Sequence, residues 1–262
     1  MFIKDVEIYR NDEIRNGNYI LSFKDEDIAK NVKMGQFVEI KVGNGSEHLL
    51  RKPISINDVI GDEIVILYKV VGKGTGDLVK YKKGDKINIL GPVGYGFPKV
   101  SDNKELLIVA GGIGSGPFSF VVRNTKNWKY FYGCRDKNEI ILDDLINGNK
   151  DKFIVSTDDG SYGTKGYVTD RLTEYLENNK DNLNNKIIFT CGPEIMMKKV
   201  IAIAEKYNVE SYASLEEYMG CGIGACMGCV KKIKNSEKEE GWEYKKVCKD
   251  GPVFKGSDII WD

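Results

Sequence analysis

The chain has little histidine, little proline and little tryptophan. Its 262 residues include one histidine, six prolines and three tryptophans. Because no second histidine exists to pair with it, His48 is expected to be structural rather than catalytic. The shortage of proline beside 29 glycines favours tight turns over stiff linkers.

An excess of charge of either sign is also missing. The chain carries 39 basic and 39 acidic side chains. It therefore has no electrostatic footprint for nucleic acid or for an anionic membrane, and neither is expected as a partner. An apolar content of 41% excludes wholesale disorder, and the length suits one or two domains with a small extra module.

Long apolar runs are absent as well. The longest uncharged segment covers residues 106–122, and several glycines and Pro117 interrupt it. It is too short and too broken for a membrane-spanning helix. The N-terminus interleaves charged and apolar residues and has no signal-peptide core. A cytoplasmic protein is expected, in which the six cysteines do not form a disulfide framework.

Three regions of the chain differ in their hydrophobic pattern. In residues 1–97, short alternating apolar runs are separated by Gly and Asn/Asp clusters, which is typical of a small antiparallel barrel or sandwich. In residues 98–214, short apolar strands alternate with helical stretches, which predicts an α/β domain with a parallel sheet. Residues 215–262 form a cysteine-containing module that is too small to build a core without a staple. The predicted fold is a β-barrel, an α/β domain and a small C-terminal module.

Four cysteines stand close together in the C-terminal module. Cys221, Cys226 and Cys229 have the spacing C-x4-C-x2-C, and Cys248 follows after 18 residues. This is the ligand spacing of plant-type [2Fe-2S] clusters, in which one tight loop supplies three thiolates and a further segment supplies the fourth. The glycines between them keep the loop small, so that its N–H groups can point at the cluster sulfurs. The spacing predicts that these four cysteines hold such a cluster.

A structural zinc site is the alternative for the same thiols. Four-cysteine zinc sites usually use two C-x2-C pairs, whereas here only Cys226 and Cys229 form one. A zinc-stapled nucleotide-binding protein without redox activity therefore stays open as a function of another class. The isolated Cys134 and Cys191 are expected to be small buried apolar side chains.

Several short segments have the composition of phosphate-binding turns. RKPISI at residues 51–56 places a cation and a hydroxyl on one extended strand. Gly72–Gly76 puts glycine amides and the Thr75 hydroxyl at a helix start. Each signal alone is also consistent with an ordinary strand turn or helix start.

Glycine-rich turns follow two predicted strands of the α/β region. Gly112, Gly114 and Pro117 belong to a G-x-G-x-x-P turn between a strand and a helix, which is the context that a dinucleotide-binding loop needs. The segment Cys191–Pro193, with Gly192 at its centre, ends another strand, at the kind of edge where open parallel sheets bind ligands. The polar segment 157–166 follows a third strand and is expected at the rim of the same site.

Taken together and in this order, these motifs resemble the ferredoxin-reductase-like superfamily and, within it, the electron transfer subunits of dihydroorotate dehydrogenase B. The resemblance covers essentially the whole chain. Its most specific parts are SLEEYMGCGIGACMGC and VCKDGPVF, which join the cysteines to flanking sequence typical of that family. The other motifs that carry it are RKPISI, GKGT, GPVGYGF, GGIGSGP, TDDGSYGTKG and CGPEIMM.

The resemblance implies FAD in the barrel, NAD(H) as substrate at the α/β domain and the cluster in the C-terminal module. It implies no acid or base catalyst in this chain. The family usually has arginine where this chain has Lys52, which offers a point charge in place of a fork, so Arg51 is a candidate second cation. The FAD positions carried over are Lys52, Pro53, Ile54, Ser55, Leu67, Tyr68, Lys69, Gly74 and Thr75.

The resemblance also implies a function and a partner. Electrons pass between NAD(H), FAD and the cluster, to or from an FMN-containing catalytic subunit that oxidises dihydroorotate to orotate in pyrimidine biosynthesis. A heterotetramer with two copies of each subunit is expected. Related subunits serve ferredoxin:NADP oxidoreductases, sulfide dehydrogenases and hydrogenases, so a different partner stays the alternative. Arg135 could in principle meet the 2′-phosphate of NADPH, so NADH is inferred from the resemblance alone.

Overall fold

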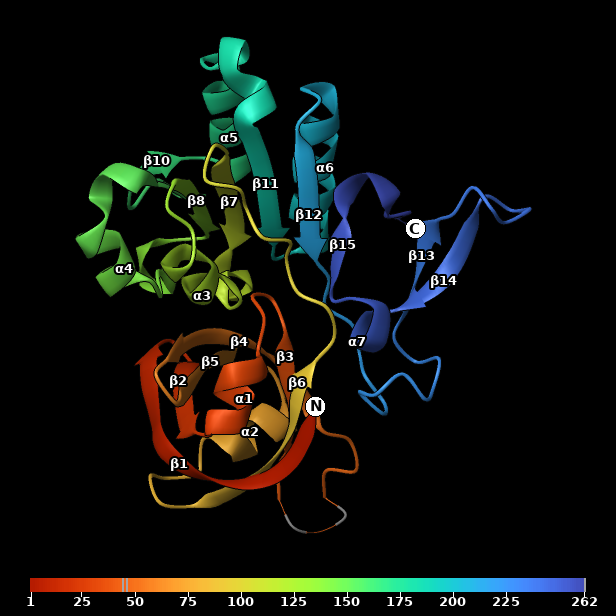
Figure 1. The fold of residues 1–262 in the computed structure, drawn as a ribbon. Helices are drawn as coiled ribbons and strands as arrows, with labels where there is room; N and C mark the ends of the chain where they lie inside the picture. The colour runs from red at the N-terminus through yellow and green to blue at the C-terminus, as the bar shows by residue number, and fades with distance from the viewer. Residues whose placement is uncertain (44, 46, 262) are drawn as a thin grey trace.

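An antiparallel barrel forms the N-terminal part of the computed structural model, which describes residues 1–43, 45 and 47–261. Within these residues six strands close the barrel in the order β1-β2-β5-β4-β3-β6 (Figure 1). Alternate side chains fill its interior, among them the fully buried Leu21, Val38 and Ile64. The elements are β1 (Phe2–Arg15), β2 (Asn18–Lys24), α1 (Glu26–Asn31), β3 (Phe37–Lys41), β4 (Lys52–Ile60), β5 (Glu63–Lys69), α2 (Lys73–Leu78) and β6 (Lys86–Val93).

A second, mostly parallel sheet follows the barrel. Seven strands of the described chain form it in the order β10-β9-β8-β7-β11-β12-β15, and of these seven only β15 runs antiparallel to its neighbour. The chain leaves β7 toward β8 on one side and returns to β11 on the other, which creates a topological switch point between β7 and β11. The strands are β7 (Glu105–Gly111), β8 (Trp128–Cys134), β9 (Phe153–Thr157), β10 (Thr164–Lys165), β11 (Lys186–Cys191), β12 (Glu210–Ser214) and β15 (Val253–Lys255).

Helices cover both faces of this sheet because its central strands are apolar on both sides. Leu106 and Ile108 pack on the face of the helices α3 and α4, whereas Leu107 and Val109 pack on the face of α5 and α6. The helices are α3 (Phe118–Arg123), α4 (Asp143–Gly148), α5 (Val168–Glu177) and α6 (Glu194–Lys206), with short 3-10 helices η1 (Gly112–Ser115), η2 (Lys137–Glu139), η3 (Lys150–Lys152) and η4 (Lys180–Asn185).

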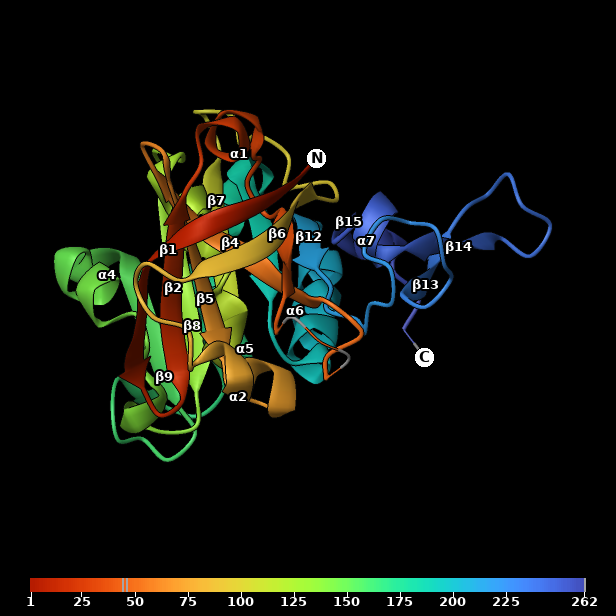
Figure 2. The same ribbon diagram turned by 90° about the horizontal axis from the view of Figure 1, so that it is seen from below.

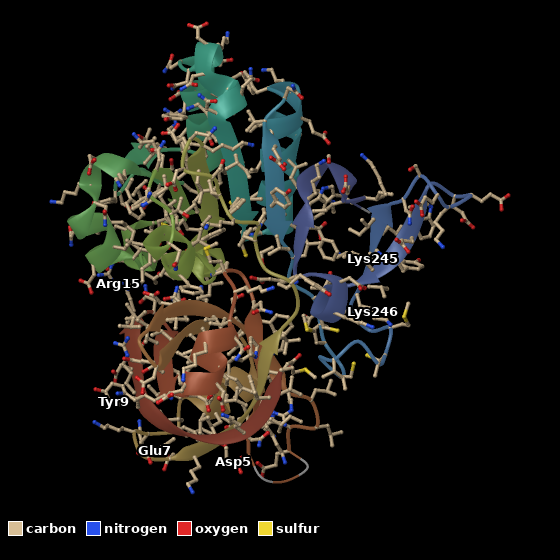
Figure 3. The ribbon with its side chains drawn as sticks, in the orientation of Figure 1. Asp5, Glu7, Tyr9, Arg15, Lys245 and Lys246 are labelled. Atoms are coloured by element: carbon tan, nitrogen blue, oxygen red, sulfur yellow. The ribbon has the colours of Figure 1, made fainter. Side chains whose placement is uncertain are left out.

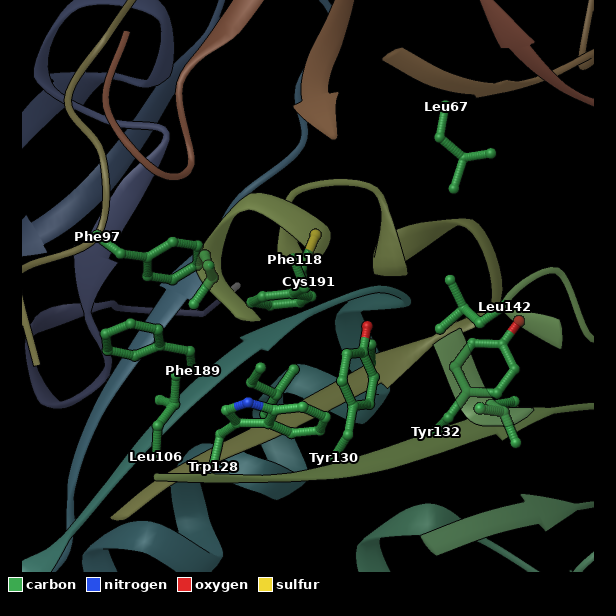
Figure 4. Packing of buried hydrophobic residues seen from close by; sticks show 14 of the residues in the cluster. Leu67, Phe97, Leu106, Phe118, Trp128, Tyr130, Tyr132, Leu142, Phe189 and Cys191 are labelled. Atoms are coloured by element: carbon green, nitrogen blue, oxygen red, sulfur yellow. The ribbon is translucent and has the colours of Figure 1, made fainter. Parts of the chain in front are cut away.

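An aromatic stack joins the barrel to the sheet. Phe97, which ends the glycine-rich connection after β6, stacks on Phe189 of β11 with ring centroids 4.4 Å apart and on Phe118 of α3 at 5.5 Å (Figure 4). The Phe97 N–H also donates to the carbonyl of Met34 in the barrel at 2.7 Å. The connection therefore fixes how the barrel sits against the sheet.

The C-terminal segment contributes to both neighbours instead of standing apart. Its hairpin of β13 (Val230–Lys234) and β14 (Trp242–Lys246) projects from the molecule and leads into α7 (Val247–Asp250) (Figures 1 and 2). Its last strand, β15, then completes the parallel sheet, and η5 (Gly256–Asp258) follows. One apolar cluster combines side chains from all three parts: Phe37, Leu90, Val93, Met197, Ile201, Ala213, Leu215, Met219, Cys229, Ile233, Val247, Cys248, Phe254 and Ile259.

The predicted fold class is confirmed, with an antiparallel barrel, a parallel-sheet α/β part and a small cysteine-containing C-terminal segment. No helix among the described residues has the length and apolar character needed to cross a membrane.

Candidate cofactor sites

Two adjacent cavities lie beside the loop that follows β7. The first, here called the barrel cavity, has a volume of about 680 Å³ and lies against β4 and β5. The second, here called the sheet cavity, has a volume of about 770 Å³ and lies at the carboxyl ends of β7, β8, β9 and β11. Both volumes are in the range of ordinary ligand sites.

The predicted FAD residues gather at the barrel cavity. All of them except Gly74 line it, and they come from the start of β4, the end of β5 and the start of α2. Gly74 lies against the Lys52 side chain: a Cβ at position 74 would come within 2.1 Å of the Lys52 Cε. The lysine side chain crosses the open face of the glycine, and its Nζ donates to the Leu50 carbonyl at 2.9 Å.

Arg51 is held away from a phosphate-binding role. Its guanidinium donates to the Asn88 side chain and to the carbonyls of Asn88 and Glu39, although the residue also borders the barrel cavity. Lys52 and Lys69 are the further cations in the lining of this cavity, and the Ser55 and Thr75 hydroxyls line it as well, so that these groups can meet a pyrophosphate. Thr75 Oγ1 accepts from the Val71 and Gly72 N–H groups at 3.0 and 3.3 Å, which fixes the start of α2.

The predicted NAD residues divide between the two cavities. Gly112, Gly114, Gly192 and Pro193 line the sheet cavity, while Cys191 is buried beneath it. Pro117 lines the barrel cavity instead, because η1 and the start of α3 carry the chain across to that side.

Positions 114 and 112 are occupied by glycine for different structural reasons. A Cβ at position 114 would lie 2.4 Å from the Gly192 Cα and 2.6 Å from the Cys191 carbonyl oxygen. Gly114 therefore lets the two strand-end turns meet. A Cβ at Gly112 would meet nothing within 4 Å, but its φ of +52° favours glycine. The dinucleotide-binding role expected of both glycines stays a prediction.

Sequence reasoning predicted Lys69 but missed the rest of the wall that the two cavities share. Among the described residues, Lys69, Ile113, Leu215 and Glu216 line both. Glu216 has exposed surface in the cavities, but protein atoms closely surround its carboxyl group. The resulting desolvation raises the pKa of Glu216. The Cys191 thiol donates to Glu216 Oε1 at 3.9 Å. The position of Glu216 just before the cysteines was its one available signal.

Charged side chains in the lining of the sheet cavity are paired with one another. Arg135 donates to Glu139 through Nε at 3.0 Å and also through Nη2, so its charge is balanced within the chain. Lys69 lies 3.9 Å from the same carboxylate, and Asp158 adds a further acidic side chain to the lining. A 2′-phosphate would meet these carboxylates, whereas a ribose hydroxyl could donate to them.

The four predicted cluster ligands lie in one region. The Cys226 N–H donates to Cys221 Sγ at 3.3 Å, and the Cys248 N–H donates to Cys229 Sγ at 3.4 Å. The Gly224 backbone N–H also hydrogen-bonds to the Cys248 thiol, which connects the two pairs of cysteines. Desolvation raises the pKa of Cys221, but N–H groups of the loop outweigh it and lower that pKa to about 6.

These contacts fit a cluster held by thiolates. All four cysteines are free thiols, and loop amides already point at two of the sulfurs, which is the arrangement that stabilises thiolate ligands. The thiols stand in pairs, and among the described residues no three Cys, His, Asp or Glu side chains converge on one metal position. The cluster-ligand assignment thus stays a prediction supported by position.

Comparison with known proteins assigns two parts of the chain. Residues 216–260 match the model of the iron-sulfur cluster binding domain of dihydroorotate dehydrogenase B. Residues 108–201 match the oxidoreductase NAD-binding domain. The first range contains the four cysteines, and the second contains the glycine turns of the sheet cavity.

Curated relatives match over nearly the full length. A dihydroorotate dehydrogenase B (NAD(+)) electron transfer subunit of Desulforamulus reducens is 36% identical and covers 93% of either chain. A protein of the same name from Clostridium acetobutylicum is 38% identical and covers 97% of this chain and 96% of its own.

Solved structures share the arrangement of the parts. The structure of an NADH-dependent reduced ferredoxin-NADP oxidoreductase superposes with a TM-score of 0.79 at 27% identity, and covers 98% of this chain and 90% of its own. Phthalate dioxygenase reductase, at 18% identity and a TM-score of 0.67, covers 94% of this chain and 77% of its own and shares the fold.

Proposed function

The chain belongs to the family of dihydroorotate dehydrogenase B electron transfer subunits, and from this premise we propose that it passes electrons between NAD(H), a bound FAD and a [2Fe-2S] cluster. The observation that carries the proposal is the wall shared by the two cavities. Leu215 and Glu216 line both the predicted nicotinamide site and the predicted flavin site, and five residues later the same segment reaches Cys221. One continuous stretch of chain thus borders all three redox sites.

The residues at the barrel cavity fit FAD. Lys52 supplies a cation and Ser55 and Thr75 supply hydroxyls for its pyrophosphate, while Leu67 and Tyr68 of β5 offer an apolar wall for its ring. When bound, FAD can take two electrons as a hydride and release them one at a time. The chain's own task is to bind and orient the cofactors, because no side chain is assigned as an acid or base.

The residues at the sheet cavity favour NADH over NADPH. Glu139 occupies the guanidinium of Arg135, and Asp158 adds a second carboxylate at the same end. These groups repel a 2′-phosphate and accept hydrogen bonds from a ribose. The amides of the turn at Gly112 are left for the pyrophosphate.

The surface around the cysteines supports a protein partner. Tyr218, Ile223 and Met227 are 95%, 46% and 57% exposed, and they flank Cys221 and Cys226. Exposed apolar side chains beside a redox centre are suited to docking another protein. The proposed partner is an FMN-containing catalytic subunit that oxidises dihydroorotate to orotate, in an assembly of two copies of each chain. The proposed location is the cytoplasm, where free thiols persist.

A different partner is the second candidate. The structural likeness to the NADH-dependent reduced ferredoxin-NADP oxidoreductase, at 27% identity, supports an equivalent subunit in an enzyme of that type. The curated relatives, at 36–38% identity over nearly the whole chain, support the dihydroorotate enzyme more strongly.

Cofactor analysis of the purified chain tests the proposal. We expect flavin and iron–sulfur absorption bands, one FAD, two irons and two sulfides per chain, and reduction of an artificial dye by NADH. The zinc alternative predicts a colourless protein with stoichiometric zinc. That result would overturn the redox assignment.

A further inference from the structure

Glu39 is a buried carboxyl group on the outer face of the barrel. It lies in β3 between Val38 and Ile40, whose side chains fill the barrel interior and have no exposed surface. Because side chains alternate along a strand, Glu39 faces the opposite side, as does Phe37 in the shared apolar cluster. Glu39 is nevertheless only 1% exposed. Something outside the barrel therefore covers it.

The loop of residues 220–229, here called the cysteine loop, covers Glu39. A Cβ built on Gly222 would lie 2.3 Å from Glu39 Oε1, 2.7 Å from its Cδ and 2.8 Å from its Cγ. The carboxyl group thus rests directly on the backbone of the residue that follows Cys221. Gly222 also has a φ of +68°, so both its conformation and its contact require glycine.

The Glu39 carboxyl has few other partners. Its Oε1 makes no hydrogen bond among the described residues. Desolvation raises the pKa of Glu39 to about 7, and the guanidinium of Arg51 opposes this shift. Burying such a group is costly unless it performs a task, and a plain filler at this position would be apolar.

Glu39 also lies next to the flavin residues. It pairs with Pro53 across the ladder of β3 and β4, and its own carbonyl accepts from the Arg51 side chain at 3.3 Å. Phe37, two residues earlier, lines the barrel cavity. A single side chain therefore connects the strand pair of the flavin cavity with the loop that carries the cysteines.

The cysteine loop is held at a second glycine from another direction. A Cβ on Gly224 would lie 2.5 Å from the Lys249 Cδ, and Lys249 follows Cys248 in α7. That contact joins parts of the C-terminal segment to each other. The contact at Gly222 ties the loop to the barrel.

We propose that Glu39 is a positioning residue: its carboxyl group holds the cysteine loop at Gly222 and thereby fixes the loop relative to the flavin cavity. The inference rests on the proposed function, because the loop's position matters for electron transfer only if the cysteines hold the cluster. Electron transfer rates depend steeply on distance, so a displaced loop would slow transfer without removing either cofactor.

Three single variants, one double variant and a matched control test this contact. Glu39→Ala removes the carboxyl group, Glu39→Gln keeps its shape, and Gly222→Ala inserts a methyl group against it. Glu7→Gln is the control, since Glu7 is exposed on β1 of the same barrel (Figure 3). The measurements are FAD content, iron content, the lifetime of the cluster absorbance under a chelator and the electron paramagnetic resonance spectrum of the reduced cluster.

We expect all variants to keep FAD. Glu39→Ala and Gly222→Ala should each shorten the cluster lifetime on the order of tenfold and alter the resonance spectrum, because the first leaves a cavity beneath the loop and the second creates a clash there. Glu39→Gln should stay within about twofold of the unaltered protein, as should the control. The double variant Glu39→Ala with Gly222→Ala should be longer-lived than Gly222→Ala alone, because removing the carboxyl relieves the clash.

Strictly additive effects, or an unchanged cluster in Glu39→Ala, would overturn the inference and leave the cluster assignment intact. An unaltered protein without iron would instead overturn the cluster assignment. In that case hydrogen exchange of the amides in residues 220–229 shows whether Glu39 holds the loop. Faster exchange in Glu39→Ala than in Glu7→Gln supports the contact, and equal exchange refutes it.

Discussion

At the scale of single residues, some functional side chains can be found from their spacing in the sequence, and others can be found only from the fold. The cysteines could be found because cluster ligation demands four thiolates at a fixed spacing. Glu39 could not, because nothing in its immediate sequence distinguishes it from a solvated glutamate, and Glu216 offered only its position just before the cysteines. Their environments arise from contacts with distant segments: Glu39 meets Gly222, and Glu216 meets Cys191.

Replacing one predicted ligand should remove the cluster and nothing else. We expect Cys226→Ser to lose the iron–sulfur absorbance completely, because a hard alkoxide replaces a soft thiolate poorly. FAD content should stay stoichiometric, since the barrel cavity does not include Cys226. The measurement is the visible spectrum with iron and flavin analysis. Cys134→Ser is the control, and loss of iron in that variant alone would show that the ligands are misassigned.

Glu216 should give the fold a pH dependence of known sign. Its folded-state pKa is raised above the ordinary 4.5, chiefly by desolvation, so ionising it costs more in the folded chain than in the unfolded chain. This cost is absent below the ordinary pKa, grows as the pH rises through the raised value and then stays constant. We therefore expect Glu216→Gln to match the unaltered chain in urea unfolding at pH 4 and to be more stable at pH 8. A stability gain at pH 4 that vanishes at pH 8 would contradict the sign.

At the scale of elements, local patterns predicted the strands whose residues are apolar on both faces. The runs at 106–110, 128–132, 153–157 and 187–190 are found in β7, β8, β9 and β11. The last two strands of the sheet along the chain, β12 and the edge strand β15, were not predicted, because they are short and their pairing depends on distant segments. β15 in particular pairs with a strand that lies about forty residues earlier in the chain.

The turn after β7 should be sensitive to one methyl group. Gly114→Ala would place a Cβ 2.4 Å from the Gly192 Cα, and backbone atoms cannot yield as a flexible side chain can. We expect a loss of about 1–3 kcal/mol in the free energy of unfolding and a rise of at least about tenfold in the KM for NADH, because both turns of the sheet cavity move. Urea unfolding and steady-state reduction of a dye measure these two effects.

Gly148→Ala is the matched control for that substitution. Gly148 ends α4, and a Cβ there would meet nothing within 4 Å. Its unfolding free energy should change by less than about 1 kcal/mol, and its KM for NADH should not change. A control as impaired as Gly114→Ala would remove the close approach of the two turns as the cause.

At the scale of the whole molecule, the three parts are bound together by one shared core. The apolar cluster that contains Cys229 and Cys248 also contains Phe37 of the barrel and Ile201 of α6. The C-terminal segment therefore does not need to fold alone, and the staple that its small size predicted is supplemented by packing on both neighbours. A rigid arrangement of this kind suits electron transfer, which depends on fixed distances between cofactors.

The division of labour between this chain and its proposed partner gives the last prediction. The chain alone should reduce a dye with NADH but leave dihydroorotate unchanged, because its two cavities are assigned to FAD and NAD(H). Mixed with the catalytic subunit, it should support conversion of dihydroorotate and NAD⁺ to orotate, NADH and a proton. Cys226→Ser should abolish this linked reaction and keep most of the dye reduction, since a dye can accept electrons from FAD directly. Steady-state turnover of the chain, the mixture and the variant mixture measures each claim. Dihydroorotate oxidation by the isolated chain would refute the electron-transfer role, and full linked activity in a verified cluster-free variant would refute the route through the cluster.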